Sequence, residues 1–179
     1  MKLRRAALIA LTALAIPMAL AFSGCEVEEE KASVEKKGGE EGGGEGATAA
    51  VGDNLSLKGT TYKVTGAETA SSVGDQYTGA EANGIFVIVD LTLTNEEDEP
   101  ATILEDNLNI IGGNGDEYST SDDAVLAFPD QSFLLEEIQP GLSEDGKLVF
   151  DIPPAAVKGA KLQVEDLFSS STGEIDLGL

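Results

Sequence analysis

The chain has 179 residues, with 33 acidic against 11 basic side chains and a formal net charge of −22 at neutral pH. Nucleic acids bind proteins through Lys and Arg, so this charge argues against a nucleic-acid ligand. The sequence contains no His, which removes the commonest general base and the commonest transition-metal ligand.

Residues 1–24 have the features of a bacterial signal peptide. Basic residues open the chain, an apolar run covers residues 6–22, and small residues precede Cys25. The stretch Phe22-Ser23-Gly24-Cys25 resembles the lipobox of bacterial lipoproteins, although Phe22 stands where Leu is usual. The resemblance implies that Cys25 begins the mature chain and carries acyl chains such as palmitate. Two or more chains suffice for stable membrane anchoring.

Two other interpretations of this segment remain open. The apolar run of 17 residues lies at the lower limit for an uncut transmembrane anchor. It also fits an ordinary secretory signal that is followed by an incidental cysteine. All three interpretations place the mature domain outside the cytoplasm. If lipid occupies Cys25, no thiol remains for a disulfide, a metal site or nucleophilic catalysis.

Residues 25–50 are predicted to form a disordered tether. Glu and Gly predominate there, and Val27 and Val34 are the only aliphatic residues larger than Ala. Such a segment cannot bury enough apolar surface to fold by itself. Its expected role is to hold the following domain off the membrane.

Residues 51–179 have the size of one domain. Residues 61–65 are the first predicted strand, and residues 67–83 are predicted to be a polar loop at one end of the fold. Residues 84–95 are the strongest strand, with period-two alternation of apolar side chains. Its second face starts apolar with Phe86 and Ile88 and turns polar from Asp90, which is typical of a central strand partly covered on its outer side.

Shorter elements follow this strand. Further strands are predicted at residues 107–111, 132–135, 147–152, 161–165 and 175–177, and residues 122–127 are predicted to be one helical turn capped by an Asp. Many short strands separated by turn signals favour an all-β fold, an antiparallel β-sandwich.

The order of several landmarks resembles a known family. These landmarks are Val51-Gly52-Asp53, the strand end at residues 89–95 with Glu99-Pro100, Gly115-Asp116-Glu117-Tyr118, Pro140-Gly141 before residues 148–153, and the close at residues 175–178. The set resembles the domain-of-unknown-function family numbered 4352, which is common in bacterial lipoproteins. That family is similar to the secreted mycobacterial immunoprotective antigens. The resemblance implies an immunoglobulin-like sandwich over residues 51–179, but it supplies no catalytic residue.

The first functional hypothesis is a non-enzymatic binding or adhesion module on the cell surface. Loops at one end of a sandwich are common recognition sites, so residues 67–83 are the candidate loop and Tyr77 its candidate anchor. Tyr62 and Tyr118 are the other aromatic stacking candidates, and Tyr62 is expected in the core. The expected partners are the membrane, through lipid on Cys25, and an unidentified envelope or extracellular ligand.

Three alternatives remain open. The domain could be a structural spacer, coat component or antigen. It could bind calcium through residues 95–99, or through residues 114–117 with Asp122 and Asp123, although neither has helix–loop–helix calcium spacing. It could also be a hydrolase with two carboxylates about 5–10 Å apart across a cleft. We predict no enzyme activity, no cofactor and no metal.

Overall fold

The computed structural model describes residues 32–35, 41–43, 48–128, 131, 133, 135–168 and 171–179. The signal segment and Cys25 lie outside these residues, so the predictions of cleavage and lipidation remain predictions. Within the described ranges, no helix is long and apolar enough to cross a membrane.

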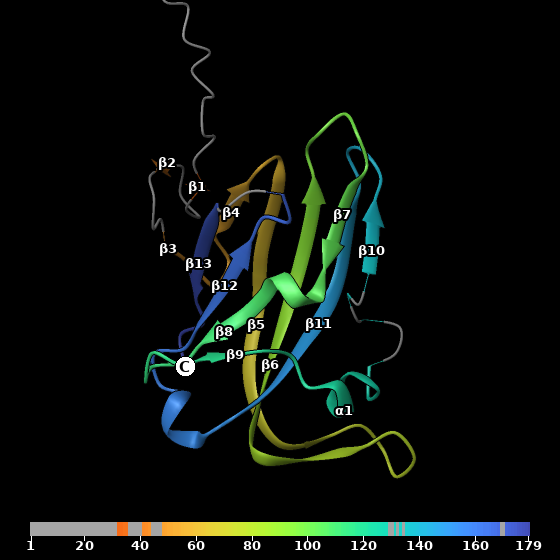
Figure 1. Ribbon diagram of the computed structural model, residues 1–179, viewed down its shortest axis with the longest axis vertical. Coiled ribbons are helices and arrows are strands. Elements are labelled where there is room, and N and C mark those ends of the chain that lie inside the picture. Colours follow the sequence, from red (N-terminus) through yellow and green to blue (C-terminus); the bar gives the residue numbers. More distant parts are fainter. Residues whose placement is uncertain are drawn as a thin grey trace, which may run out of the picture.

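Two sheets pack face to face and confirm the predicted immunoglobulin-like β-sandwich (Figure 1). The larger sheet has the order β11-β6-β5-β4-β1-β2, the smaller has the order β3-β13-β12-β8-β9, and β10 pairs with β7. All pairs are antiparallel except β3 with β13. The strands are β1 (Ser33–Glu35), β2 (Glu41–Gly43), β3 (Thr48–Ala50), β4 (Asn54–Leu57), β5 (Thr60–Val73), β6 (Ala80–Asn95), β7 (Ala101–Leu104), β8 (Leu108–Ile111), β9 (Glu117–Tyr118), β10 (Leu135–Ile138), β11 (Ser143–Ile152), β12 (Lys161–Glu165) and β13 (Thr172–Asp176).

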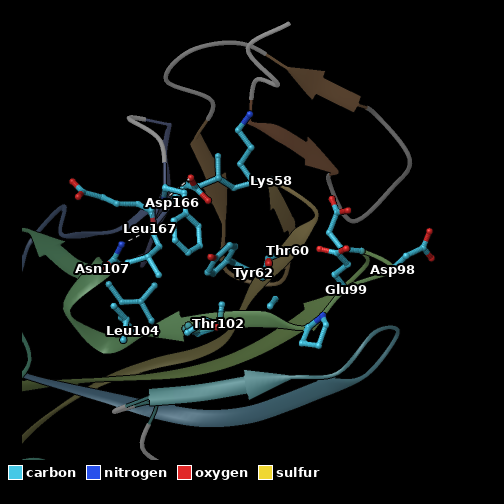
Figure 2. A pocket seen from close by; sticks show the side chains of 18 residues that line it. Lys58, Thr60, Tyr62, Asp98, Glu99, Thr102, Leu104, Asn107, Asp166 and Leu167 are labelled. Atoms are coloured by element: carbon cyan, nitrogen blue, oxygen red, sulfur yellow. Dashed lines mark hydrogen bonds between the residues drawn. The ribbon is translucent and has the colours of Figure 1, made fainter. Parts of the chain in front are cut away.

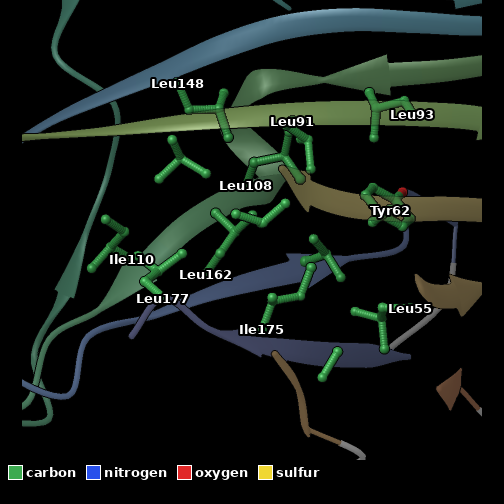
Figure 3. Close-up of a cluster of buried hydrophobic side chains, with 14 of the residues drawn as sticks. Leu55, Tyr62, Leu91, Leu93, Leu108, Ile110, Leu148, Leu162, Ile175 and Leu177 are labelled. Carbon is green, nitrogen blue, oxygen red and sulfur yellow. The ribbon is translucent and has the colours of Figure 1, made fainter. Parts of the chain in front are cut away.

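The core lies between the two sheets (Figure 3). Side chains of β6, such as Leu91 and Leu93, face Leu162 of β12 and Ile175 of β13. All four are at most 1% exposed. Burying each such side chain contributes roughly 1.5–3 kcal/mol, so the alternation in β6 is a major determinant of the fold.

The outer face of the larger sheet carries a second apolar cluster. Phe86 and Ile88 of β6 pack there with Val149 of β11 and Ala124 of the short helix α1 (Asp122–Val125). This confirms the prediction that β6 is partly covered on its outer side. The helical turn is also confirmed, but its N-cap residue is Ser121 and not an Asp.

Several boundaries differ from the prediction. β12 has the predicted bounds. The predicted strand at residues 132–135 lies partly outside the described residues; residue 133 is not in a strand, and β10 includes Leu135 and continues to Ile138. Strands β4, β7 and β9 were missed. Each has at most four residues, too few for an apolar alternation to stand out from its neighbours.

The predicted loop at residues 67–83 is mostly strand, and this prediction was wrong. β5 and β6 pair as far as Val73 and Ala80, so only residues 74–79 form a turn. Small residues such as Ala70 and Ala82 cover the second cluster from these strands. Large apolar residues are rare in this stretch, so the sequence showed little strand periodicity. We call residues 67–83 with their turn the hairpin end.

Parts of the expected tether join the sandwich. β1 pairs with β4 and β2, and β3 pairs with β13. Val34 is 2% exposed and Ala32 is 4% exposed. One apolar side chain cannot fold a segment alone, but it can add a strand to the edge of a sheet that already exists.

Candidate functional site

A pocket of about 630 Å³, drawn in Figure 2, has its lining at one end of the sandwich, and the hairpin turn lies at the other end. Its walls come from the β4–β5 turn, the β6–β7 turn, β7 and the β12–β13 turn. β5 starts at the pocket with Thr60 and ends at the hairpin with Val73, which places the two features at opposite ends. We call the three turns with their pocket the pocket end.

The β4–β5 turn brings backbone close to the pocket rim. Lys58 and Gly59 both have positive φ, 48° and 69°, and they are the two residues between the paired Leu57 and Thr60. This geometry matches a type I′ hairpin turn, in which glycine is favoured. A Cβ on Gly59 would lie 1.9 Å from Oε1 of Glu97, so the missing side chain makes room for that carboxylate.

Asn95 fixes the β6–β7 turn. Its side-chain amide donates hydrogen bonds to the carbonyls of Glu99 and Ile138, at 2.8 and 2.9 Å. Its Oδ1 accepts a bond of 2.9 Å from the backbone N–H of Glu97. The side chain is fully buried and its bond to Ile138 lies in the interior, so the three bonds hold the acidic turn against β10.

The β12–β13 turn forms the third wall. Oδ2 of Asp166 accepts a hydrogen bond of 3.1 Å from the backbone N–H of Phe168. The amide of Asn107 donates to the carbonyl of Glu165 at 3.4 Å and links this turn to the short 3₁₀ helix η1 (Glu105–Asn107). Leu167 and Phe168 remain exposed beside the pocket, and Phe168 is 87% exposed.

The pocket has an apolar floor and an acidic rim. Tyr62 lies between Asp166 and the pair Asp98 and Glu99 in the view of Figure 2. Burial and the charge of Asp166 raise the pKa of the Tyr62 hydroxyl from 10.0 to about 12, so the phenol is neutral at physiological pH. Lys58 is the basic residue among those that line the pocket. The apolar lining residues are Leu57, Tyr62, Pro100, Ala101, Ile103, Leu104, Leu108, Leu167 and Phe168, and the acidic ones are Glu97, Asp98, Glu99, Glu165 and Asp166.

The three tyrosines lie in different places. Tyr62 is a buried pocket residue, which confirms its expected core position. Tyr77 lies in the hairpin turn at 85% exposure, where its backbone N–H bonds to Oδ1 of Asp75 at 2.8 Å. Tyr118 accepts a hydrogen bond of 2.8 Å from the amide of Asn114. The structure therefore does not bring Tyr77, the predicted anchor, together with the pocket.

Three of the candidate calcium ligands, Asn95, Asn114 and Asp116, are engaged in local hydrogen bonds. Asn95 uses its amide group in the turn described above, and the amide nitrogen of Asn114 bonds to Oδ2 of Asp116 at 2.7 Å. Among the described residues, no group of three or more acidic, His or Cys side chains is arranged to hold a metal ion.

Glu105 is the described carboxylate whose pKa is raised. Burial raises its pKa above the ordinary value, a hydrogen bond from Thr120 opposes the shift, and the charges of Asp106 and Asp122 add to it. The residue is 4% exposed, and its Oε2 has no hydrogen-bond partner. Glu105 is not among the residues that line the pocket. The carboxylate with the raised pKa therefore lies outside the pocket that could hold a ligand.

Comparison with known proteins places the fold in a family. Residues 49–175 match the family described as Domain of unknown function (DUF4352). The chain belongs to this family. The match confirms the family resemblance found in the sequence. No functionally curated protein matches the chain.

Solved structures share the DUF4352 fold. The YjhA protein of Bacillus subtilis is 13% identical, with a TM-score of 0.56, 72% of this chain covered and 99% of its own. The secreted protein MPT63 of Mycobacterium tuberculosis is 17% identical, with a TM-score of 0.56 and coverages of 73% and 97%. The candidate lipoprotein YcdA of Bacillus subtilis is 15% identical, with a TM-score of 0.50 and coverages of 69% and 38%. At these identities the likeness establishes the sandwich.

The pocket was missed in the sequence. Its lining comes from residues 57–62, 97–108 and 165–168, which are far apart in the chain. A partial signal is present in the acidic turn at residues 96–99, which lies within the candidate calcium stretch of residues 95–99. The second signal was the exposed Leu167-Phe168 pair in an otherwise polar turn.

Proposed function

We propose that this protein is a lipid-anchored, extracytoplasmic binding module without enzymatic activity. Its ligand carries a positive charge next to an apolar group, as a peptide with Lys or Arg beside Leu or Phe does. The observation that carries this proposal is the pocket, in which five carboxylates and one ammonium group surround an apolar floor.

The size and lining of the pocket support a ligand of this class. Small-molecule and peptide pockets usually have volumes of about 300–1,000 Å³, mostly apolar walls and a few polar groups that orient the ligand. Here Tyr62, Ile103 and Leu108 supply buried apolar surface. The acidic rim favours a cation and disfavours an anion, because like charges at an interface repel.

The position of the module outside the cytoplasm rests on the signal segment and on Cys25. Two of the similar structures, secreted MPT63 and the candidate lipoprotein YcdA, agree with such a location. Mass spectrometry of the mature protein tests this part of the proposal. A diacylglyceryl mass on Cys25 is expected, and an unmodified N-terminus at another residue contradicts the anchor.

The ligand class is tested by titrating the full chain with two fluorescent peptides, one of alternating Lys and Leu and one of alternating Glu and Leu. Saturable binding of the Lys/Leu peptide alone is expected. Phe168→Ala and the double variant Asp98→Asn/Glu99→Gln should each weaken binding severalfold, because one removes apolar contact and the other removes rim charge.

Matched control variants separate the pocket from general attraction between opposite charges. Tyr77→Ala removes an equally exposed aromatic side chain at the hairpin end. Glu68→Gln/Glu81→Gln removes two exposed hairpin carboxylates, so its net charge equals that of the rim variant. Equal losses in the rim and hairpin variants would contradict a specific pocket. No saturable binding would favour the spacer, coat or antigen alternative.

A further inference from the structure

We propose that the pocket end of the sandwich faces the membrane and that the hairpin end points away from it. The pocket then receives its cationic ligand from the membrane surface. This inference rests on the lipid anchor of the proposed function and adds to it the orientation of the domain, which follows from the direction of β1.

The direction of β1 is fixed by its register. Ser33 pairs with Ser56 and Glu35 pairs with Asn54, so β1 runs antiparallel to β4. β4 runs toward Leu57, which lines the pocket. β1 therefore starts beside the pocket end and runs away from it (Figure 1).

Burial fixes this entry point. Ala32 and Val34 are 4% and 2% exposed and belong to the main core together with Leu55 and Leu57. Moving β1 by one residue would turn Val34 toward solvent, because side chains alternate between the two faces of a strand. The chain thus enters the domain at a defined place next to Leu57 and not along a loose segment.

The anchor is close to this point. Six residues separate Cys25 from Ala32, which makes seven Cα-to-Cα steps. An extended chain covers at most about 3.6 Å per residue, so the two Cα atoms lie within about 25 Å of each other, whatever the conformation between them. The expected tether of residues 25–50 is shortened to these six residues on this account.

The hairpin end is much farther from that entry point. β6 has 16 residues and reaches from the hairpin to Asn95 at the pocket end. A strand rises about 3.3 Å per residue, so β6 spans about 50 Å. The length of β6 exceeds the longest reach of the linker, so the linker keeps the pocket end near the bilayer, whereas the hairpin end can stand about 50 Å farther away.

This orientation gives the acidic rim a function. Anionic bilayers enrich cationic peptides within about 8 Å of their surface, and the short linker lets the pocket end approach that layer. Repulsion between the acidic domain and the headgroups falls off over about 8 Å at physiological salt, so the anchor can hold the domain near the surface. Phe168 and Leu167 lie exposed on the same side and offer apolar contact to a ligand lying there.

Energy transfer from a label on the protein to labelled lipids tests the orientation. Cys25 is the chain's single cysteine and carries the lipid in the proposed function, so Phe168→Cys and Tyr77→Cys each introduce one labelling site. The two positions are 87% and 85% exposed, which makes them a matched pair. The full lipidated chain is placed in vesicles of phosphatidylglycerol and phosphatidylcholine that contain an acceptor lipid in the outer leaflet.

Transfer from position 168 should exceed that from position 77 at least about twofold, given the length of β6. Equal transfer, or more transfer from position 77, overturns the orientation. The anchor itself is still supported in that case if mass spectrometry finds lipid on Cys25. Absence of lipid on Cys25 overturns the anchor and the orientation together. If transfer differs as expected but the Lys/Leu peptide does not bind, the orientation is supported and only the proposed ligand class is contradicted.

Discussion

At the pocket end, the buried amide of Asn95 holds the β6–β7 turn against β10. At the hairpin end, two strands meet in one turn, and the links are carboxylates. Oδ1 of Asp75 accepts bonds within the turn, and Asp151 accepts bonds from Asn83 and Gly84 at its base. The β6–β7 turn at the pocket end is thus held by a neutral side chain that is itself buried, and the hairpin end by charged groups near solvent.

This difference predicts opposite responses to pH and to mutation. A buried amide keeps its hydrogen bonds at every pH, whereas a carboxylate loses its acceptor strength when it is protonated. The pocket end contains a buried tyrosine, which makes it sensitive to alkali. The four predictions below test this contrast, beginning with the largest expected effect.

Asn95→Ala should lower the free energy of unfolding by about 3 kcal/mol, because it removes the buried bond to the carbonyl of Ile138 and two part-buried bonds to Glu97 and Glu99. Asp75→Ala, the corresponding change at the hairpin end, should alter the global stability much less, since its turn is exposed. Urea denaturation of both variants measures the difference. Asn95→Asp, which places a buried carboxylate against the two carbonyls, should lose at least as much stability as Asn95→Ala. Equal losses for Asn95→Ala and Asp75→Ala would contradict the contrast.

Alkaline pH should destabilise the fold through Tyr62. The folded state prefers the neutral phenol, so the contribution is complete below the ordinary pKa of 10.0 and is lost as the pH rises through about 12. A shift of two units corresponds to about 2–3 kcal/mol. Urea denaturation across this pH range should show a steeper loss for wild type than for Tyr62→Phe. Parallel curves for the two proteins would show that Tyr62 does not carry the effect.

Acid should loosen the base of the hairpin. Partial burial raises the pKa of Asp151, but bonds from Gly84 and Asn83 outweigh it and lower the pKa below 3.8. The stabilisation is therefore present above the ordinary Asp pKa and is lost as the pH falls through the lowered value. The amide proton shifts of Asn83 and Gly84 in an NMR titration should follow this ionisation together, and Asp151→Asn should abolish it. A midpoint above the ordinary Asp pKa would rule out the bonded carboxylate.

The smallest effect is expected for the two exposed aromatic residues. Phe168→Ala and Tyr77→Ala should each change the free energy of unfolding by less than about 0.5 kcal/mol, since both side chains lie mostly in solvent. Thermal unfolding of the two variants checks this. A large loss in Phe168→Ala alone would mean that this residue supports the β12–β13 turn, and its binding result would then need a milder replacement such as Phe168→Leu.

The contrast between the ends also explains which parts of the fold were predictable. The alternation over residues 84–95 predicted which side chains of β6 face the core and which face outward. It could do so because apolar residues occupy every second position of a strand that has one buried face. The hairpin end shows no such alternation of large apolar residues. The residues that pack there have small side chains, namely Ala70, Ala80 and Ala82, and they belong to the same cluster as Ala124 of α1. Hydrogen-bond pairing with β6, and not hydrophobic periodicity, makes residues 67–73 a strand.

The same reasoning applies to the segment before the domain. Val34 alone gave no reason to expect structure, and a segment with one large apolar side chain does not fold in isolation. The open edge of β4 supplies the missing partner, and the core accepts Val34 between Leu55 and its neighbours. A tertiary contact thereby changes the expected length of the linker and the orientation inferred from it.

The sequence by itself determined the all-β fold, the excess of negative charge and the candidate lipidation site at Cys25, because each depends on residues adjacent in the chain. Only the tertiary structure decided where the charge gathers around an apolar floor. Three turns distant in sequence meet at one end of the sandwich and create the pocket, and β1 enters the sheet beside them. Such a site depends on which strand ends become neighbours, and that is settled by the packing of the whole domain.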